Sequence, residues 1–430
     1  MARKMKDSGI EWIKSIPENW ECKRGKQLFI ETNERSIAGT EELLTVSHIT
    51  GVTPRRQKNV NMFMSESLTG YKICHPGDIA ANTMWLWQGA VGISNYHGII
   101  SPSYNTYRQR TNDYDSKYLD YLLRIQPLID TYAAYSTGIT LSRLRLYPES
   151  FLSIYFIVPP LTEQQHISSY LDVHCSEIDA MLSKTRSSIE EYKKLKQAVI
   201  TQAVTKGVRG EREMKDSGVE WIGEIPKEWD IIKSSRIIKT TQNGLSRRDL
   251  EKSEGQIILK LKNITSDGKI DYSFLNRITL SQNELNTYAL TTGDFLFVRV
   301  NGSKSLVGKC AIFEAISEIV AYNDHIIRVK LSNQCYNRFF LWYLYSCCGK
   351  AEIDLHTSTA AGQYTISGDG LRDITLVFPP IDEQKEIADY LDAKCAEIDG
   401  LIAKKEQLVK ELESYKKSLI YEVVTGKREV

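Results

Sequence analysis

Apolar residues recur seven positions apart in two long stretches of the chain, residues 162–205 and 382–425, and such a repeat is typical of coiled-coil helices. The predicted seam consists of Leu171, Ile178, Tyr192 and Val199, with Met181 and Leu195 between them, and of Leu391, Ile398, Leu412 and Leu419, with Leu401, Leu408 and Tyr415 between them. No proline lies in either stretch. Each stretch therefore predicts one helix of about 60 Å.

Both predicted helices have clear start signals. Each follows a Pro-Pro pair, at Pro159 and at Pro379. Thr162 and Gln165 have the spacing of a capping box, and Asp382 is a suitable N-cap. The two helices could pair with each other in antiparallel fashion, or each could pack separately on its own domain.

The segments before these helices have a mixed pattern. We call residues 21–158 the first middle segment and residues 230–378 the second. Short runs rich in β-branched and aromatic residues, bounded by Gly, Asn and Asp, predict strands at residues 43–49, 257–264, 294–300 and 319–329. Residues 116–132 and 337–353 have helical patterns. Each middle segment is therefore expected to form a compact α/β domain.

The chain contains an internal repeat. MKDSGIEWIKSIPENWE at residues 5–21 returns as MKDSGVEWIGEIPKEWD at residues 214–230, and the helix that starts at Pro159 returns 220 residues later at Pro379. The middle segments share only short landmarks in the same order, such as Gly-Asp at residues 77–78 and 293–294. Such repeats indicate one structural unit used twice. Two unrelated domains between duplicated segments remain an alternative.

These patterns predict an α/β (α+β) fold with two similar globular domains, a pair of long antiparallel coiled-coil helices and a pseudo-two-fold internal repeat. The expected divisions are an opening segment at 1–20, the first middle segment at 21–158, a long helix at 159–207, a linker with the repeated opening segment at 208–229, the second middle segment at 230–378 and a second long helix at 379–430.

Composition narrows the class of protein. The chain has 430 residues and 42% hydrophobic residues, enough to bury more than one core. Its apolar runs are far shorter than the roughly 20 residues of a membrane span, so we expect a cytoplasmic protein. The eight cysteines form no Cys-x-x-Cys pair, which argues against structural zinc and a disulfide framework. We expect no metal site.

Catalytic motifs are missing from the sequence. GSKSLVGK at residues 302–309 has the wrong glycine spacing for a phosphate loop, and Cys310 stands where a magnesium-binding Ser or Thr would be needed. The paired Asp78 and Asp294 are expected to cap turns. We predict no catalytic residue and no bound cofactor in this chain.

Basic and amide side chains instead gather in polar loops of the middle segments. Arg, Asn and Gln can pair with guanine and adenine edges, whereas Lys and Ser hold phosphates. A net charge of +1 argues against a uniformly basic protein surface, but it does not show where the charges lie. Trp85 is expected to pack the loop or the core rather than to contact DNA. The candidate DNA-binding residues are Arg55, Arg56, Asn82, Trp87, Gln88 and Ser101 in the first segment, and Arg247, Arg248, Lys262, Asn263, Arg299, Asn301 and Lys304 in the second.

The repeated MKDSG opening segments, the Pro-Pro-x-x-Glu-Gln helix starts and the Leu-Asp pairs at residues 171 and 391 resemble the specificity subunits of type I restriction-modification systems over the whole chain. The resemblance implies a non-catalytic subunit whose two target recognition domains each read one half of a bipartite DNA target, with the coiled coil setting the spacer. It also implies that modification subunits, two of them, dock on the helices, and that restriction subunits join them. S-adenosylmethionine, ATP and Mg are then expected in the partner subunits.

Two other functions are open at this point. One is an architectural protein-binding scaffold held together by the coiled coil. The other is a self-sufficient DNA-modifying enzyme, which would need a metal-binding or cofactor-binding motif that the sequence lacks.

Overall fold

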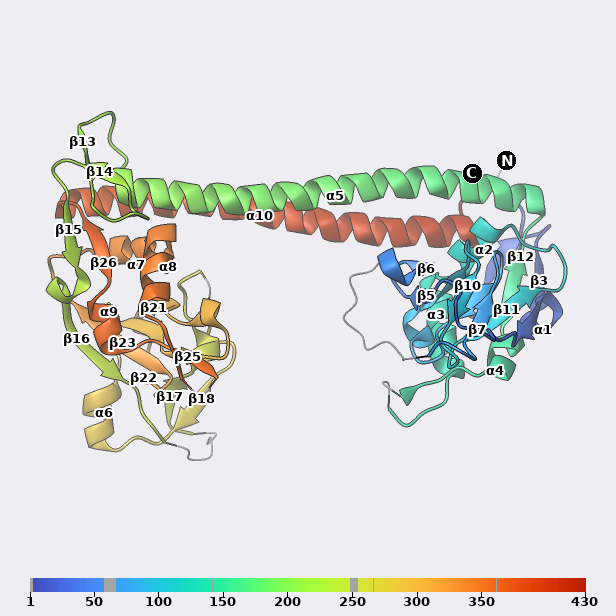
Figure 1. Ribbon diagram of the computed structural model, residues 1–430, viewed down its shortest axis with the longest axis horizontal. Helices are drawn as coiled ribbons and strands as arrows, with labels where there is room; N and C mark the ends of the chain where they lie inside the picture. The colour runs from blue at the N-terminus through green and yellow to red at the C-terminus, as the bar shows by residue number, and fades with distance from the viewer. Residues whose placement is uncertain (1–2, 58–66, 141–142, 248–253, 266, 361) are drawn as a thin grey trace. The chain divides into compact units, whose positions relative to one another are not determined.

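The computed structural model describes residues 3–57, 67–140, 143–247, 254–265, 267–360 and 362–430 (Figure 1). The chain divides into two compact units. Unit 1 comprises residues 1–186 and 406–430, and unit 2 comprises residues 187–405. Each unit therefore contains one middle segment, part of one long helix, and part of the other.

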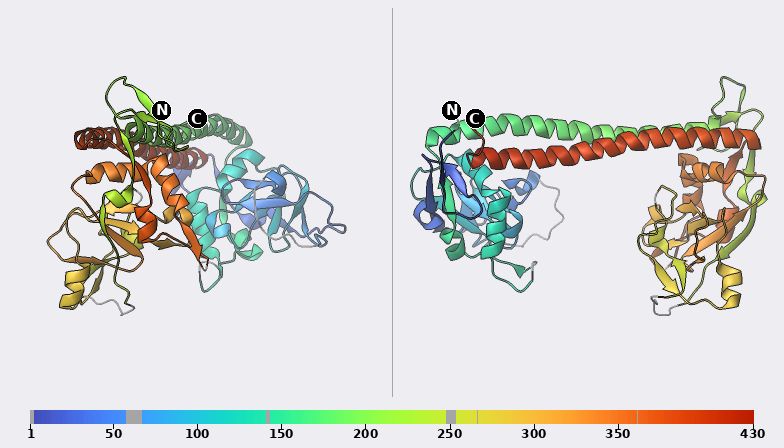
Figure 2. Two further views of the ribbon diagram at one scale, coloured as in Figure 1. Left: turned by 60° about the vertical axis from the view of Figure 1, so that its left-hand side comes forward. Right: turned by 180° about the vertical axis from the view of Figure 1, so that it is seen from behind.

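Two long helices are contributed by the chain, α5 (Leu161–Lys206) and α10 (Ile381–Val424). Within unit 1 they run antiparallel, with Lys416 bound to Asp179 at 2.6 Å and Arg186 to Glu413 at 2.5 Å. Within unit 2 Lys196 binds Asp399 at 2.6 Å. Figure 2 shows the two helices side by side from two further directions. The predicted antiparallel pairing is therefore confirmed, and the alternative of separately packed helices is not.

The seam between the helices follows a heptad pattern. The predicted residues seven positions apart are correct, whereas most of the residues predicted between them are wrong. The eight predicted positions that are spaced by heptads face the partner helix or the domain: Leu171, Ile178, Leu391, Ile398 and Leu419 are buried, and Tyr192, Val199 and Leu412 are half-buried. Four of the five residues predicted between them face solvent, with Met181 55%, Leu195 47%, Leu408 43% and Tyr415 51% exposed, whereas Leu401 is half-buried.

The buried residues of α5 alternate in steps of four and three, as knobs-into-holes packing requires. Cys175, Leu182 and Ile189 therefore occupy the second set of seam positions, each one residue away from the heptad register that Met181 and Leu195 would need. In α10 the same shift brings Cys395 into the seam. At Met181 the prediction failed because the adjacent Leu182, which is equally apolar, is the residue buried in the seam.

Each unit begins with a small hairpin and contains a central antiparallel sheet. In unit 1 the sheet order is β4-β11-β8-β9, and smaller two-stranded sheets flank it. The elements are β1 (Met5–Asp7), β2 (Ser15–Pro17), β3 (Glu21–Arg24), α1 (Gly25–Leu28), β4 (Phe29–Thr32), β5 (Leu44–Ser47), β6 (Gly51–Pro54), η1 (Arg55–Gln57), β7 (Lys72–Cys74), β8 (Ile79–Ala81), η2 (Leu86–Gln88), β9 (Val91–Ile93), β10 (Gly98–Ile100), β11 (Asn105–Gln109), α2 (Ser116–Leu123), α3 (Gln126–Tyr135), α4 (Pro148–Ser153) and β12 (Tyr155–Val158).

Unit 2 repeats this plan with the sheet order β16-β23-β19-β21, so the two middle segments share one fold. The elements are β13 (Met214–Asp216), β14 (Glu224–Pro226), β15 (Asp230–Lys233), η4 (Ser234–Arg236), β16 (Ile238–Asn243), β17 (Gln256–Leu259), η5 (Leu261–Asn263), β18 (Asn276–Ile278), α6 (Gln282–Tyr288), β19 (Phe295–Val298), β20 (Val300–Asn301), η6 (Lys304–Leu306), β21 (Cys310–Ile312), β22 (Val320–Tyr322), β23 (Ile326–Leu331), α7 (Asn337–Tyr345), α8 (Cys347–Leu355), β24 (Ser358–Ala360), β25 (Gln363–Thr365), α9 (Gly368–Arg372) and β26 (Thr375–Phe378).

The helix predicted in each middle segment is broken into two. In unit 1, α2 and α3 are separated before Pro127, which occupies the first turn of α3, because proline favours a new helix start over a continuing helix. In unit 2, Ser346 caps α8 by accepting a hydrogen bond from the Gly349 amide. The turn-capping role of the paired aspartates is confirmed, since Asp78 accepts from the His75 amide and Asp294 from the Thr291 amide.

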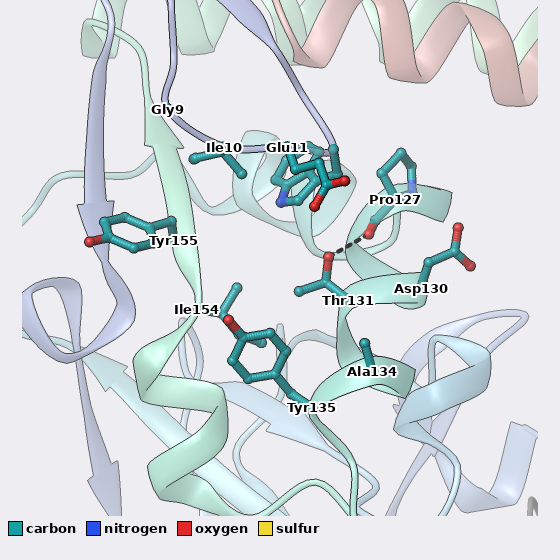
Figure 3. Close-up of a pocket in the computed structure, with 11 residues that line it drawn as sticks. Gly9, Ile10, Glu11, Pro127, Asp130, Thr131, Ala134, Tyr135, Ile154 and Tyr155 are labelled. Carbon is teal, nitrogen blue, oxygen red and sulfur yellow. Dashed lines mark hydrogen bonds between the residues drawn. The ribbon is translucent and has the colours of Figure 1, made fainter.

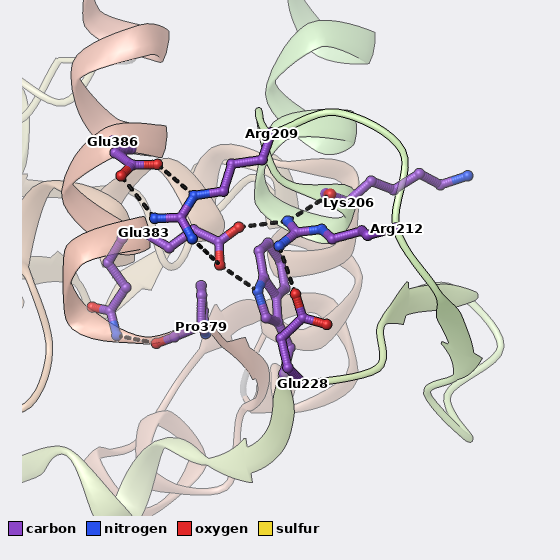
Figure 4. A network of polar contacts seen from close by, with 9 residues as sticks. Lys206, Arg209, Arg212, Glu228, Pro379, Glu383 and Glu386 are labelled. Atoms are coloured by element: carbon purple, nitrogen blue, oxygen red, sulfur yellow. Dashed lines mark hydrogen bonds and ion pairs between the residues drawn. The ribbon is translucent and has the colours of Figure 1, made fainter.

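A buried tryptophan fastens each opening segment to the first turn of the following long helix (Figure 4). In unit 2 the Trp229 indole donates to Glu383 at 2.8 Å. Arg212 lies over the indole ring, with its guanidinium 5.0 Å from the ring centroid, and binds Glu383 at 2.5 Å. Glu383 is 1% exposed. A buried carboxylate of this kind is tolerated because it is both paired and hydrogen-bonded.

Unit 1 contains the equivalent arrangement. Trp20 donates to Glu163 at 2.9 Å, and Arg3 binds the same carboxylate and lies over the indole. The end of the other helix also meets this tryptophan. A Cβ on Gly426 would lie 2.5 Å from Pro17 and 3.0 Å from Trp20, and φ is +70° there. Glycine is therefore required where α10 ends.

The seam assignment predicts different effects for two neighbouring residues of α5. Ile178→Ala should lower the free energy of unfolding by about 2 to 5 kcal/mol, because it leaves a cavity in the seam. Met181→Ala should change it by no more than about 0.5 kcal/mol, because its side chain faces solvent. Urea denaturation followed by circular dichroism measures both. Equal effects would contradict the register.

The carboxylates in the first turn of α10 should also differ. Glu383→Gln leaves the Arg212 guanidinium without its buried counter-charge, so the free energy of unfolding should fall by about 3 to 5 kcal/mol. Glu386→Gln, which removes the exposed ion pair with Arg209 at 2.8 Å, is the matched control and should have a clearly smaller effect. Thermal unfolding of the two variants compares them, and a larger loss in Glu386→Gln would contradict this account.

Candidate nucleic-acid interface

One edge of the central sheet in unit 1 gathers polar side chains where β8 ends and β11 begins. Asn82, directly after β8, is 5% exposed and donates to the Tyr104 hydroxyl at 2.9 Å. Its own oxygen accepts from the Met84 amide at 3.3 Å. Thr83 donates to the Ser103 carbonyl at 2.7 Å. These bonds join the loop after β8 to the segment before β11.

The amide of Asn82 is thus used inside the domain, and its predicted contact with DNA stays a prediction. Inside the domain it positions Tyr104. Burial raises the pKa of Tyr104, and the charge of the nearby Arg55 opposes this shift. Arg55 therefore lies in the electrostatic neighbourhood of the same edge.

The loop around η2 presents two tryptophans. Their rings stack with centroids 6.2 Å apart and planes inclined by 16°, and the Trp87 indole donates to the Met84 carbonyl at 3.0 Å. The core residue of this loop is Leu86, which is 1% exposed, whereas Trp85 is 48% exposed. Trp85 therefore packs within the loop, against Trp87, and the turn directs Leu86 into the core instead.

The other candidates of unit 1 lie near this loop or on η1. Gln88 is half-buried at the end of η2. The Ser101 hydroxyl contacts that of Ser103 at 2.9 Å. Arg56 binds Glu42 at 2.8 Å, and its side chain remains 76% exposed.

In unit 2 three candidate loops converge on the turn at residues 323–325. Leu245 donates its amide to the Tyr322 carbonyl at 2.9 Å, and the Asn323 amide donates to the Leu259 carbonyl at 3.0 Å. The Arg299 amide donates to the His325 carbonyl at 2.8 Å. The loops that hold Arg247, Lys262 and Arg299 are therefore brought to one edge. No sequence motif indicated this turn as their meeting point.

The side chains at this edge differ in availability. Asn263 is 1% exposed, accepts from the Lys260 amide, and donates to the Asp271 and Phe274 carbonyls. Its side-chain oxygen and nitrogen both form hydrogen bonds inside the domain, and its predicted contact with DNA stays a prediction. Arg247 binds Glu284 at 3.0 Å. Lys262 lies 5.3 Å from the ring centroid of Phe274, an exposed aromatic residue that the sequence did not single out.

The remaining candidates of unit 2 follow β19. Arg299 donates to the Asp324 carbonyl at 3.1 Å, and Asn301 accepts from the Ser303 amide at 2.9 Å. Lys304 lies 3.9 Å from Asp354. Arg248 lies outside the described residues.

Other kinds of site find little support. In the part of the chain that the structure describes, no group of three or more His, Cys, Asp or Glu side chains could hold a metal ion. Among those same residues, no helix has the length and apolar character needed to cross a bilayer. The candidate edges carry hydrogen-bonding and cationic groups.

Comparisons with known proteins agree with the repeated architecture. Residues 226–411 match the type I restriction modification DNA specificity domain. The chain is 27% identical over 267 residues to the type I restriction enzyme EcoKI specificity subunit of Escherichia coli K12, covering 62% of this chain and 55% of that protein. It is 25% identical over 432 residues to the MjaVIII specificity subunit of Methanocaldococcus jannaschii, covering 96% and 93%. The matches span 55% and 65% of the length of the EcoKI and StySPI subunits.

Solved structures support the fold. One solved structure concerns the complex assembly and conformational transition of the type I R-M system. A chain of it aligns with a TM-score of 0.74 at 14% identity, covering 96% of this chain and 99% of that one. The HsdS subunit of Thermoanaerobacter tengcongensis aligns with a TM-score of 0.53 at 14% identity, covering 96% and 98%. With two similar α/β domains and paired long helices, the chain is similar to type I restriction enzyme specificity subunits, and residues 226–411 carry a match to their DNA specificity domain.

Proposed function

We propose that this protein is the non-catalytic, sequence-specific DNA-recognition subunit of a type I restriction-modification enzyme. Residues 21–158 and 230–378 are the two target recognition domains, and each reads one half of a bipartite target. The observation that carries the proposal is the repetition of one sheet plan with different side chains at its polar edge. A retained frame with changed edge chemistry suits two readers of different sequences.

Within each domain we assign direct contacts to side chains of the loops at the polar edge. In the first domain Gln88 and Trp87 lie on η2, next to the loop that Asn82 fixes. In the second domain Arg299, Asn301 and Lys304 follow β19. Gln and Asn can bind an adenine edge through two hydrogen bonds, and Lys binds phosphate. The proposed contact residues are Arg55, Arg56, Trp87, Gln88, Ser101, Arg247, Arg248, Lys262, Arg299, Asn301 and Lys304.

The partners in this proposal are double-stranded DNA, two modification subunits docked on α5 and α10, and restriction subunits. S-adenosylmethionine, ATP and Mg belong to those partner subunits. The opening segments, residues 1–20 and 208–229, and the helices, residues 159–207 and 379–430, form the frame that sets the spacer between half-sites. A net charge of +1 favours weak DNA binding by the isolated chain, because counterion release supplies much of the affinity.

Two matched substitutions test which domain reads which half. Gln88→Ala and Asn301→Ala should each lower discrimination at one half-site by about 1 to 3 kcal/mol, because each removes a base-edge contact. The complex with the modification subunits is assembled with each variant, and its methylated sites are mapped by single-molecule sequencing. Relaxation of different halves is expected. Relaxation of the same half by both variants would contradict the domain assignment.

Exchange of the first domain gives the stronger test of function. Replacing residues 21–158 by the equivalent segment of another family member should change one half of the methylated sequence and leave the other half unchanged. An unchanged sequence would instead support an architectural scaffold. Methyl transfer or cleavage by the chain alone, supplied with DNA, Mg, ATP and S-adenosylmethionine, would show a self-sufficient enzyme.

A further inference from the structure

Unit 1 contains a cavity of about 560 Å³ that the recognition of DNA does not explain (Figure 3). Three elements line it: the loop between β1 and β2, helix α3, and the start of β12. Its aromatic walls are Trp12, Tyr135 and Tyr155, and two carboxylates, Glu11 and Asp130, come from the loop and from α3. This volume lies within the range of small-ligand sites and exceeds the space that one side chain fills.

The aromatic walls are open to solvent. Tyr135 is 47% exposed and Tyr155 is 40% exposed, while Trp12 is half-buried and packs against the core of unit 1. One ring already holds a cation, because the Arg24 guanidinium lies 5.0 Å from the centroid of Tyr155 and donates to its hydroxyl at 2.8 Å. Faces of aromatic rings attract guanidinium and ammonium groups.

The two carboxylates strengthen this preference. Neither Glu11 nor Asp130 forms an ion pair with another of the residues that the structure describes. Asp130 accepts only an amide donor, Gln126, at 2.8 Å. Both side chains are exposed. The cavity therefore combines aromatic surface with two carboxylates that form no ion pair among the described residues, a combination that favours a cationic ligand.

The position of the cavity separates it from the candidate DNA-binding edge. Tyr155, which lines the cavity, pairs with Arg24 at the end of β3. The chain then enters β4 at Phe29, which lies opposite Gln109 at the end of β11. The polar edge lies at the other end of the same strands, where Thr32 pairs with Thr106 and Asn105 with Ala81. DNA phosphates at the cavity would also be repelled by Glu11 and Asp130. A duplex is therefore a poor occupant.

We propose that this cavity binds an arginine or lysine side chain from an extended basic segment of a protein partner. The carboxylates neutralise the charged group, and the rings of Trp12 and Tyr135 cover its alkyl stem. The size of the cavity leaves room for the residues on either side. This binding needs no DNA, so its failure and a failure of the proposed function are separate results.

The test uses the full-length chain labelled with 5-fluorotryptophan and followed by fluorine NMR. The chain has seven tryptophans, and the Trp12 resonance is assigned with Trp12→Phe. N-acetyl-arginine methylamide is titrated to about 50 mM, because a single small cation is expected to bind in the millimolar range. The Trp12 resonance should shift saturably. The neutral N-acetyl-citrulline methylamide should bind at least tenfold more weakly, which tests the charge without any substitution.

The repeat supplies the controls. Glu220 and Trp221 are the equivalents of Glu11 and Trp12 in the second opening segment. Glu11→Gln combined with Asp130→Asn should weaken binding of the arginine probe at least tenfold, whereas Glu220→Gln should leave it unchanged. The proposal is overturned if the Trp12 resonance does not shift saturably, if the citrulline probe binds as well, or if the double variant binds as tightly as the unaltered chain.

Discussion

In each unit, a hydrogen bond from a buried tryptophan indole to a glutamate holds the opening segment against the first turn of a long helix. Trp229 and Glu383 form it in unit 2, and Trp20 and Glu163 form it in unit 1. An arginine completes each arrangement by pairing with the carboxylate and covering the indole. Because the end of the other long helix packs on the same tryptophan, one contact fixes the opening segment and both helices.

This arrangement explains why the repeat is clear in some segments and faint in others. The opening segments and helix starts must preserve the tryptophan, the glutamate and the close glycine contact, so little substitution is possible there. The strands of each central sheet need only buried apolar residues of suitable size. The loops at the sheet edge are constrained least in residue type. There the two units present different side chains, such as Gln88 in unit 1 and Asn301 in unit 2.

Surfaces of opposite charge character lie at the two ends of the sheet in unit 1. One end carries amide, hydroxyl and cationic groups around Asn82, Tyr104 and Arg55. The other end carries exposed aromatic rings with Glu11 and Asp130. A domain that binds DNA at one end is free to bind a protein at the other, because the two ligands require opposite charge.

The sequence by itself determined the repeat, the two long helices and the α/β class, because helical periodicity and capping depend on residues close together in the chain. It also placed one set of seam positions correctly, including Leu171 and Leu391. The tertiary structure decided the other set, since the burial of Leu182 rather than Met181 depends on the register of the facing helix. It likewise decided that Asn82 and Asn263 are internal braces and that Trp85 is exposed. Those roles depend on hydrogen-bond partners and turns formed by distant segments, which no local pattern encodes.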